Sequence, residues 1–162
     1  MTDKGIGPAM DVKYINAFTE VITSTFDTAV NSKPFRHDEF RALDGDVRNP
    51  DDLMCIITFS GTLTGAVLLT FPEATAKKVY AGLMFEEIEK LTEEAQEAFA
   101  EILNMVIGNV KASLPDQKLD FDEPMVATGK KVKFENSDGF RWLQVPMAFK
   151  DWGQFSLFIG MK

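Results

Sequence analysis

Two apolar segments, separated only by Ser60-Gly61, place the strongest constraint on how this chain can fold. Leu53–Phe59 (LMCIITF) contains no charged residue, and Thr62–Phe71 (TLTGAVLLTF) is rich in β-branched and large apolar residues. Runs of this length and composition, joined by turn-forming residues, predict a β-hairpin. Because neither run alternates regularly with polar residues, both faces of the hairpin must be covered by other parts of the chain.

Amphipathic helices on both sides of the hairpin can provide that cover. Over Asp11–Val30, apolar residues recur every three or four positions, and the first residue of this segment is a suitable N-cap. Pro72 can begin a second helix that is expected to end at Gly82. Thr92 can cap a longer third helix that ends before Pro115.

The remaining segments are expected to add strands. Asn31–Asp52 is polar and, at about twenty residues, long for a loop in a compact domain, so we expect a short buried strand within it. Because Pro146 lacks an N–H group, the strand that contains it is expected to lie at an edge or to be bulged there. The strands predicted after the third helix are Met125–Thr128, Val132–Glu135, Arg141–Phe149 and Phe155–Met161.

The order of these elements predicts an α+β fold. A helix, two strands, two helices and further strands give a largely antiparallel sheet packed with two long helices, built as two loosely similar helix-strand-strand halves. We expect one domain over residues 10–162. Residues 1–9 carry Gly5, Gly7 and Pro8 before any periodic pattern begins, so a disordered leader or a cloning remnant is expected there.

Composition excludes several classes of function. With 17 Lys+Arg against 25 Asp+Glu and a net charge of -8, the chain lacks the basic surface that nucleic acid selects. One Cys and one His are too few for an internal disulfide, a structural zinc site or a Ser-His-Asp arrangement, whereas a carboxylate-only metal site stays open. No apolar run approaches the roughly 18 to 20 residues of a membrane span, and Met1–Met10 lacks a signal-peptide core. These features favour a cytoplasmic protein with neither a nucleic-acid nor a membrane partner.

Thr92–Leu114 carries the clearest functional signal. At about 100° per residue, its apolar residues form one broad core stripe, and the opposite face is largely polar. The core stripe contains Ala95, Phe99, Ile102, Leu103, Val106, Ile107, Val110 and Leu114. The outward face contains Glu94, Glu97, Glu101, Asn104, Met105 and Gly108. Glu101 and Asn104 are three residues apart and therefore point the same way.

Three residues on this outward face are unusual for a helix surface that contacts only water. Gly108 costs roughly 1 kcal/mol relative to Ala in a helix interior, Asn104 is a poor helix former, and Met105 exposes an apolar side chain. One interpretation is an ordinary solvated face with a neutral glycine. The other is a docking face, in which Gly108 admits a partner backbone, Asn104 orients a water and Glu101 pairs with a cation.

The outward residues resemble a known motif. Glu101-Ile102-Leu103-Asn104, followed by Gly108, is similar to the E-x-x-N...G helix signature of the CheC, CheX and FliY family of chemotaxis phosphatases. Flanking similarities are Asp11-Val12-Lys13, the Ser60 to Gly65 segment and the Pro124 to Gly129 segment. The order of elements and the single motif resemble the CheX members most, which implies a CheC-like fold and a homodimer with one active helix in each subunit.

The resemblance also implies the chemistry. In this family a phosphorylated response regulator of the CheY type is the substrate, and its aspartyl phosphate is hydrolysed. The regulator supplies the Mg²⁺ and a lysine, so this chain is expected to bind no cofactor and no metal itself. Asn104 is implied to orient the attacking water, and Glu101 to pair with the regulator's lysine. Glu97, Met105 and Gly108 are expected to contribute to docking.

One position departs from the family pattern. The family usually has Asp or Ser four residues before the motif glutamate, where this chain has Glu97, and at a helix surface we expect the change to be tolerated. The first helix is an internal control, because CheC-type members carry a second motif there. The corresponding stretch, Glu20–Thr23, has no amide side chain, so we expect one site per chain.

Two other functions remain open. A non-catalytic module that docks a response regulator or a flagellar switch component would use the same face without hydrolysis, although the presence of both Glu101 and Asn104 favours an enzyme. A small-ligand or carboxylate-metal domain would need a convergent polar cluster, which the sequence does not reveal. His37 is interpreted as a surface histidine and Cys55 as a buried, inert thiol.

Overall fold

An eight-stranded sheet organises the chain. Its strands follow the order β1-β9-β10-β5-β4-β6, and in addition β2 pairs with β9 and β7 pairs with β4. All its paired strands are antiparallel. The structure, a computed structural model, describes residues 12–162, so the expected leader over residues 1–9 and the expected N-cap at Asp11 lie outside the described residues. The strands are β1 (Phe35–Arg36), β2 (Arg41–Leu43), β3 (Val47–Arg48), β4 (Leu53–Gly61), β5 (Gly65–Phe71), β6 (Leu119–Phe121), β7 (Met125–Thr128), β8 (Lys133–Phe134), β9 (Arg141–Phe149) and β10 (Gly153–Met161).

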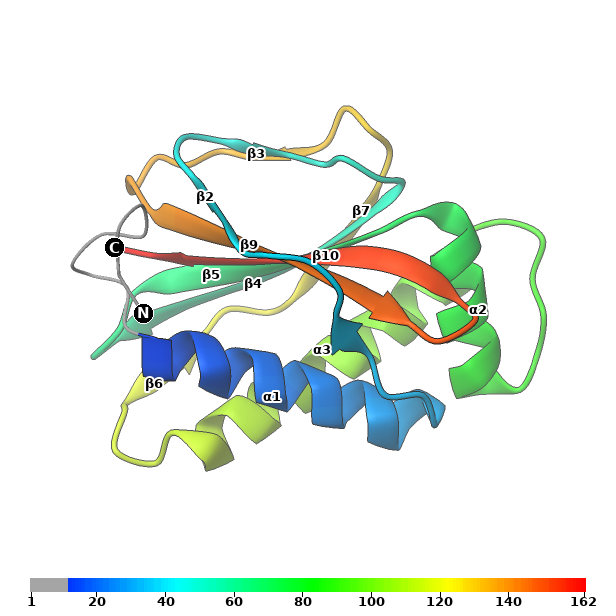
Figure 1. Cartoon of the computed structure of the whole chain (residues 1–162), viewed down its shortest axis with the longest axis horizontal. Coiled ribbons are helices and arrows are strands. Elements are labelled where there is room, and N and C mark those ends of the chain that lie inside the picture. The colour runs from blue at the N-terminus through cyan, green and yellow to red at the C-terminus, as the bar shows by residue number, and fades with distance from the viewer. Residues whose placement is uncertain (1–11) are drawn as a thin grey trace.

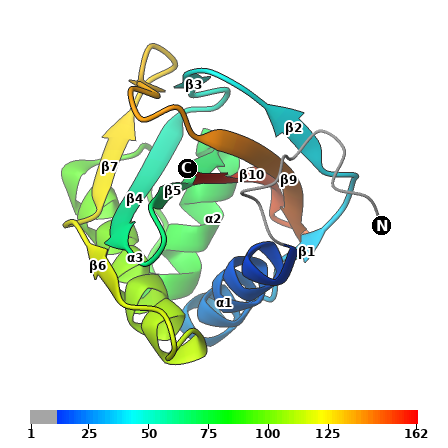
Figure 2. The same cartoon turned by 90° about the vertical axis from the view of Figure 1, so that its left-hand side faces the viewer.

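Helices cover one face of this sheet (Figure 1). They are α1 (Val12–Val30), α2 (Glu73–Met84) and α3 (Glu93–Ser113). Figure 2 shows the sheet arching over the helices, with α1 and α3 side by side below it. The predicted α+β architecture, a largely antiparallel sheet packed with two long helices, is therefore confirmed.

Phenylalanines between the helices and the sheet hold the two layers together. Phe71 of β5 stacks on Phe155 of β10 with ring centroids 4.8 Å apart. Phe99 of α3 contacts the same Phe71 ring at 5.2 Å, and Phe26 of α1 contacts Phe149 of β9 at 5.6 Å. Because these rings come from both long helices and from three strands, they fix where α1 and α3 lie on the sheet.

The opposite face of the central strands is also partly covered. β3 and β8 form a separate two-stranded sheet. Val47 of β3 joins a second buried cluster with Leu68 of β5, Trp142 of β9 and Phe158 of β10. The Trp142 Nε1–H donates to the carbonyl of Gly45 at 3.1 Å, which satisfies the one polar atom of this large side chain. The hairpin thus has cover on both faces, as its unbroken apolar runs predict.

Two boundaries that the sequence placed at glycines are wrong: the hairpin turn at Ser60-Gly61 and the end of the second helix at Gly82. Ser60 and Gly61 belong to β4, so the turn lies at residues 62–64 instead. Gly82 lies inside α2, which ends at Met84 with Phe85 in a left-handed conformation at φ 57°. A Cβ at Gly82 would lie 2.8 Å from the Trp152 side chain, so close packing, and not helix termination, requires glycine there.

The polar segment before the hairpin forms three short strands, β1, β2 and β3, where one buried strand was expected. Only Val47 among their residues is buried. β1 pairs with Met147–Ala148 of β9, and β2 pairs with Trp142–Gln144. Pro146 lies in the gap between these pairings, and its carbonyl accepts from the His37 N–H at 3.0 Å. β9 is therefore not an edge strand. Instead, the pairing of β1 and β2 along β9 is interrupted at Pro146, which has no N–H group to donate.

The strand β6 was not expected from the sequence. Its three residues pair with Phe59–Gly61 at the end of β4, and only Leu119 among them is buried. A segment this short has no detectable alternation, so pairing with β4 decides its structure.

Over residues 12–162, no helix has the length and apolar character needed to cross a membrane.

Candidate functional site

The helix α3 begins and ends as its own sequence dictates. The Thr92 hydroxyl accepts a hydrogen bond from the Ala95 N–H at 3.2 Å, which confirms the expected N-cap. Glu93 and Glu94 lie in the first turn and Lys111 lies in the last, where their charges complement the helix dipole. The candidate site thus rests on a helix whose ends are stabilised locally.

Packing fixes the rotation of α3 about its axis. The predicted core stripe is buried or half-buried, and Phe99, Ile102 and Val106 are each 1% exposed. The Asn109 Nδ2 donates to the Thr25 hydroxyl of α1 at 2.8 Å, which links the two long helices by a polar contact as well as by apolar ones. With this stripe turned inward, the opposite side of α3 must face outward.

The structure brings the sequence-predicted site residues together on that outward side. Glu97, Glu101, Asn104, Met105 and Gly108 are all exposed, within just over three turns of α3. Across residues 12–162, no hydrogen bond or ion pair engages the side chain of Glu101 or Asn104. Both polar groups are therefore free to meet a molecule that approaches the helix.

Gly108 has no structural role that the fold itself explains. A Cβ placed there would have no atom within 4 Å, in contrast to Gly82. Its φ is also not in the positive range that favours glycine. Since neither space nor backbone conformation requires glycine, its cost to the helix is not offset by contacts within the described chain. A flat, uncovered stretch of α3 results, next to Met105.

A groove between α2 and α3 lies directly beside these residues. It has a volume of about 570 Å³. Its lining consists of Tyr80, Leu83 and Met84 of α2 and Glu94, Glu97, Ala98, Glu101, Ile102 and Met105 of α3. Burial raises the pKa of Tyr80, and the nearby Glu86 and Glu94 carboxylates raise it further. Sequence reasoning missed the share of α2 in this surface, because periodicity within one helix carries no information about its neighbour.

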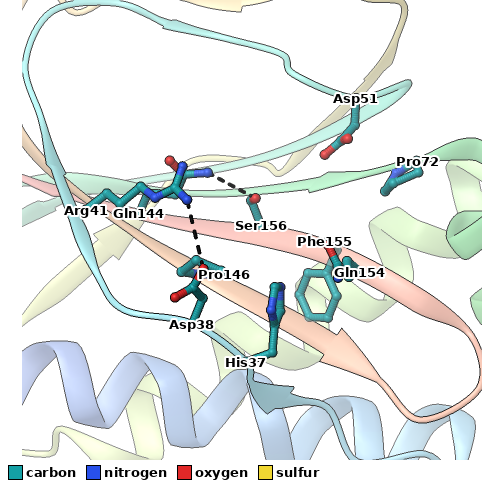
Figure 3. A pocket seen from close by; sticks show the side chains of 10 residues that line it. All are labelled: His37, Asp38, Arg41, Asp51, Pro72, Gln144, Pro146, Gln154, Phe155 and Ser156. Carbon is teal, nitrogen blue, oxygen red and sulfur yellow. Dashed lines mark hydrogen bonds and ion pairs between the residues drawn. The ribbon is translucent and has the colours of Figure 1, made fainter.

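A second, polar hollow of about 230 Å³ lies beside β9 and β10 (Figure 3). His37, Asp38 and Arg41 form one side of it, and Asp51 with Pro72 forms another. The sequence did not reveal this cluster, because its residues come from distant parts of the chain that only the sheet brings together. His37 is exposed, as expected, although it lines the hollow.

Several polar side chains of this hollow already have partners within the chain. Gln144 donates to the Ser156 hydroxyl at 3.2 Å, and the Thr70 hydroxyl donates to Asp51 at 2.9 Å. Arg41 forms an ion pair with Asp38 at 4.0 Å. Burial raises the pKa of the Asp51 carboxyl. This mutual pairing contrasts with the unengaged Glu101 and Asn104, so the α3 surface is the better candidate.

The described residues contain neither a cluster suited to a metal ion nor an accessible thiol. Among residues 12–162 there is no group of three or more His, Cys, Asp or Glu side chains that could hold a metal ion. Cys55 is fully buried, and burial raises the pKa of its thiol, which keeps it protonated at neutral pH. What α3 offers instead is an exposed carboxylate and an exposed carboxamide, three residues apart on one helix.

Comparisons with known proteins agree on one family. A family model described as "Chemotaxis phosphatase CheX" matches residues 53–148. The CheY-P phosphatase CheX of Thermotoga maritima is 24% identical over 156 residues, which cover 94% of this chain and 98% of that protein. The matched segment of the family model contains the whole of α3, including the Glu101 to Gly108 stretch.

Solved structures share the fold. A CheC-like superfamily protein from Shewanella sp. PV-4 has a TM-score of 0.79 and 24% identity, covering 94% of this chain and 99% of that one. The structure of a CheX-CheY-BeF3-Mg+2 complex from Borrelia burgdorferi has a TM-score of 0.71 and 21% identity, covering 92% and 97%. The arrangement of sheet and helices described above is therefore that of CheC-like proteins.

Proposed function

The chain belongs to the chemotaxis phosphatase CheX family, and we propose on this basis that it hydrolyses the aspartyl phosphate of a phosphorylated CheY-type response regulator. The observation that carries the proposal is the exposed, unengaged pair of Glu101 and Asn104 on the anchored helix α3. The reaction ends a two-component signal by returning the regulator to its unphosphorylated form.

Asn104 positions the attacking water. Its carboxamide accepts one hydrogen bond and donates others, so it can hold a water in line with the phosphorus atom. Phosphoryl transfer depends mainly on positioning and electrostatics, and a residue supplied by a partner protein can therefore accelerate it greatly. The side chain needs no pKa change and forms no covalent bond. A short side chain on a helix with fixed rotation suits this task, because few of its torsions have to be ordered.

Glu101 aligns the two proteins. It lies one turn before Asn104 on the same face, and its carboxylate can pair with the lysine of the regulator. Glu97 extends the same acidic line by one further turn, and Met105 and Gly108 give an apolar and a flat surface against the regulator. In this proposal the Mg²⁺ would be held by the regulator and not by this chain.

Residues 10–162 act as one domain in this proposal, and two copies associate as a homodimer that presents one α3 surface on each subunit. The resemblance to CheX members supports the homodimer. The single domain is supported by a main core that contains residues of α1, α3 and the strands β4, β5, β9 and β10. Size-exclusion chromatography with light scattering measures this directly: a mass of twice 18.1 kDa is expected, and a single-chain mass would contradict it.

The decisive experiment measures phosphate release from a Mg²⁺-bound, phosphorylated CheY-type regulator, with wild type and Asn104→Ala side by side. Acceleration by wild type that is lost in the variant is expected. Equal acceleration by both proteins would show that the assignment of Asn104 is wrong. Binding of the regulator without acceleration by either protein would instead assign the chain to non-catalytic docking modules.

A further inference from the structure

The groove between α2 and α3 has the form of a binding site for a protruding apolar side chain. Tyr80, Ala98 and Ile102 form its buried floor, with exposures of 2%, 7% and 1%. Met84 of α2 and Met105 of α3 stand above this floor with 49% and 38% of their surface exposed. Two exposed methionines beside an apolar floor are an adaptable surface that gains from being covered.

The rim of the groove has one sign of charge. Among its described lining residues, three are glutamates, Glu94, Glu97 and Glu101, and none is Lys or Arg. All three glutamates are exposed, and they follow one another at intervals of three and four residues along α3. Like charges at these spacings repel one another, so a basic partner surface would relieve the repulsion. An apolar floor with an acidic rim fits an apolar side chain flanked by lysine or arginine.

The groove is continuous with the Glu101 and Asn104 face. Glu101 and Met105 line the groove and also flank Asn104 on α3. At a rise of 1.5 Å per residue, Glu94 at the far end of the groove lies about 15 Å from Asn104 along the helix. A regulator whose phosphoryl group meets Asn104 would therefore place its neighbouring surface over the groove.

We propose that the α2–α3 groove binds a projecting apolar side chain of the response regulator, flanked by basic residues and located within about 15 Å of its phosphorylation site. This inference rests on the proposed phosphatase function and adds α2 to the docking surface. Its role is to select among response regulators, since the phosphorylated aspartate is common to all of them and the neighbouring surface is not.

Regulator-dependent kinetics of Met84→Gln and Glu94→Gln test the inference. Met84→Gln is expected to raise KM about fivefold and leave kcat within twofold, as loss of contact outside the reacting centre should do. Glu94→Gln is expected to raise KM at low salt and to weaken the dependence of KM on salt. Both positions are exposed, and equal thermal unfolding midpoints for the variants and wild type verify the fold.

Phe35→Gln provides the matched control. Phe35 is an apolar residue with the same exposed fraction as Met84, 49%, but it lies on β1 outside the groove. Its substitution is expected to leave KM unchanged. If Met84→Gln and Glu94→Gln keep the wild-type KM while Asn104→Ala has lost activity, the groove inference is wrong and the proposed function stands. A change of oligomeric mass in Met84→Gln would also overturn the inference, because the groove would then be an interface between copies of this chain.

Failure of the proposed function can be distinguished from failure of the groove inference, because binding can be measured without hydrolysis. If wild type does not accelerate hydrolysis, affinity for a regulator held with Mg²⁺ and beryllofluoride still tests the groove. Weaker binding by Met84→Gln than by Phe35→Gln would support the groove as a docking site without catalysis. Equal binding by the two variants would exclude it.

Discussion

The two long helices α1 and α3 differ in the polar groups that they present at corresponding positions of their outer faces. Both bury an apolar stripe against the same face of the sheet. On α1, the Thr19 hydroxyl donates to the Ile15 carbonyl at 2.8 Å and the Ser24 hydroxyl donates to the Val21 carbonyl at 3.2 Å. On α3, the outward Glu101 and Asn104 make no such bond within the described chain.

This difference shows why amphipathicity alone does not identify a functional helix. At the place on α1 that corresponds to the motif, Glu20 is exposed but Thr23 is half-buried and carries no amide. On α3, the equivalent pair is exposed and includes the carboxamide. The packing that both helices share therefore leaves an exposed pair of a glutamate and a carboxamide at this position only on α3.

The largest expected effect is on stability, and it should be similar for the two helices, because each is anchored by a buried phenylalanine ring. Phe99→Ala removes the α3 ring that contacts Phe71 and should cost about 3–5 kcal/mol of unfolding free energy. Phe18→Ala removes the α1 ring that stacks on Phe59 at 5.5 Å and should cost a similar amount. Chemical denaturation measures both. A cost below 1 kcal/mol for Phe99→Ala would mean that other contacts anchor α3.

Catalysis, in contrast, should depend on α3 alone. Asn104→Ala is expected to lower the acceleration of phosphate release about 100-fold while docking stays measurable, since a water-orienting group acts mainly in the transition state. Thr23→Ala on α1 is the matched control and should change the rate less than twofold. A comparable loss in both variants would remove the distinction between the helices.

Glu101 should contribute to docking as well as to rate. Glu101→Ala is expected to lower kcat/KM about tenfold and to weaken affinity for the beryllofluoride-bound regulator, because an ion pair between the proteins is lost. Glu20→Ala on α1 should leave both quantities unchanged. Unaltered regulator affinity in Glu101→Ala would limit this residue to the chemical step.

The smallest expected effect is that of Gly108→Ala, which should stabilise the fold but weaken docking of the regulator. Gly108→Ala should raise the free energy of unfolding by about 0.5–1 kcal/mol, because the added Cβ meets no atom of the chain and alanine favours the helix. If a regulator backbone approaches Gly108 closely, the same variant should raise KM severalfold. Denaturation and steady-state kinetics on one preparation test both expectations, and a stabilised variant with wild-type KM would exclude close approach at this position.

Local sequence determined the helix that carries the candidate site and some of the strands around it. The Thr92 cap and the apolar spacing of Thr92–Leu114 predicted the start, the buried stripe and the outward face of α3, and the structure has all three. Arg141–Phe149 was likewise predicted with the bounds that β9 has. These features rest on hydrogen bonds and periodicity within one segment, so they can be read without knowledge of its neighbours.

Tertiary structure decided what depends on contacts between segments distant in the chain. Gly82 is required by the Trp152 side chain that packs against α2, and β6 forms because β4 offers it a partner. The α2–α3 groove and the polar hollow beside β9 and β10 likewise combine residues far apart in sequence. Sequence periodicity reports which side of an element is buried but not which element it is buried against. The site helix could therefore be predicted from the sequence, whereas the surface around it could not.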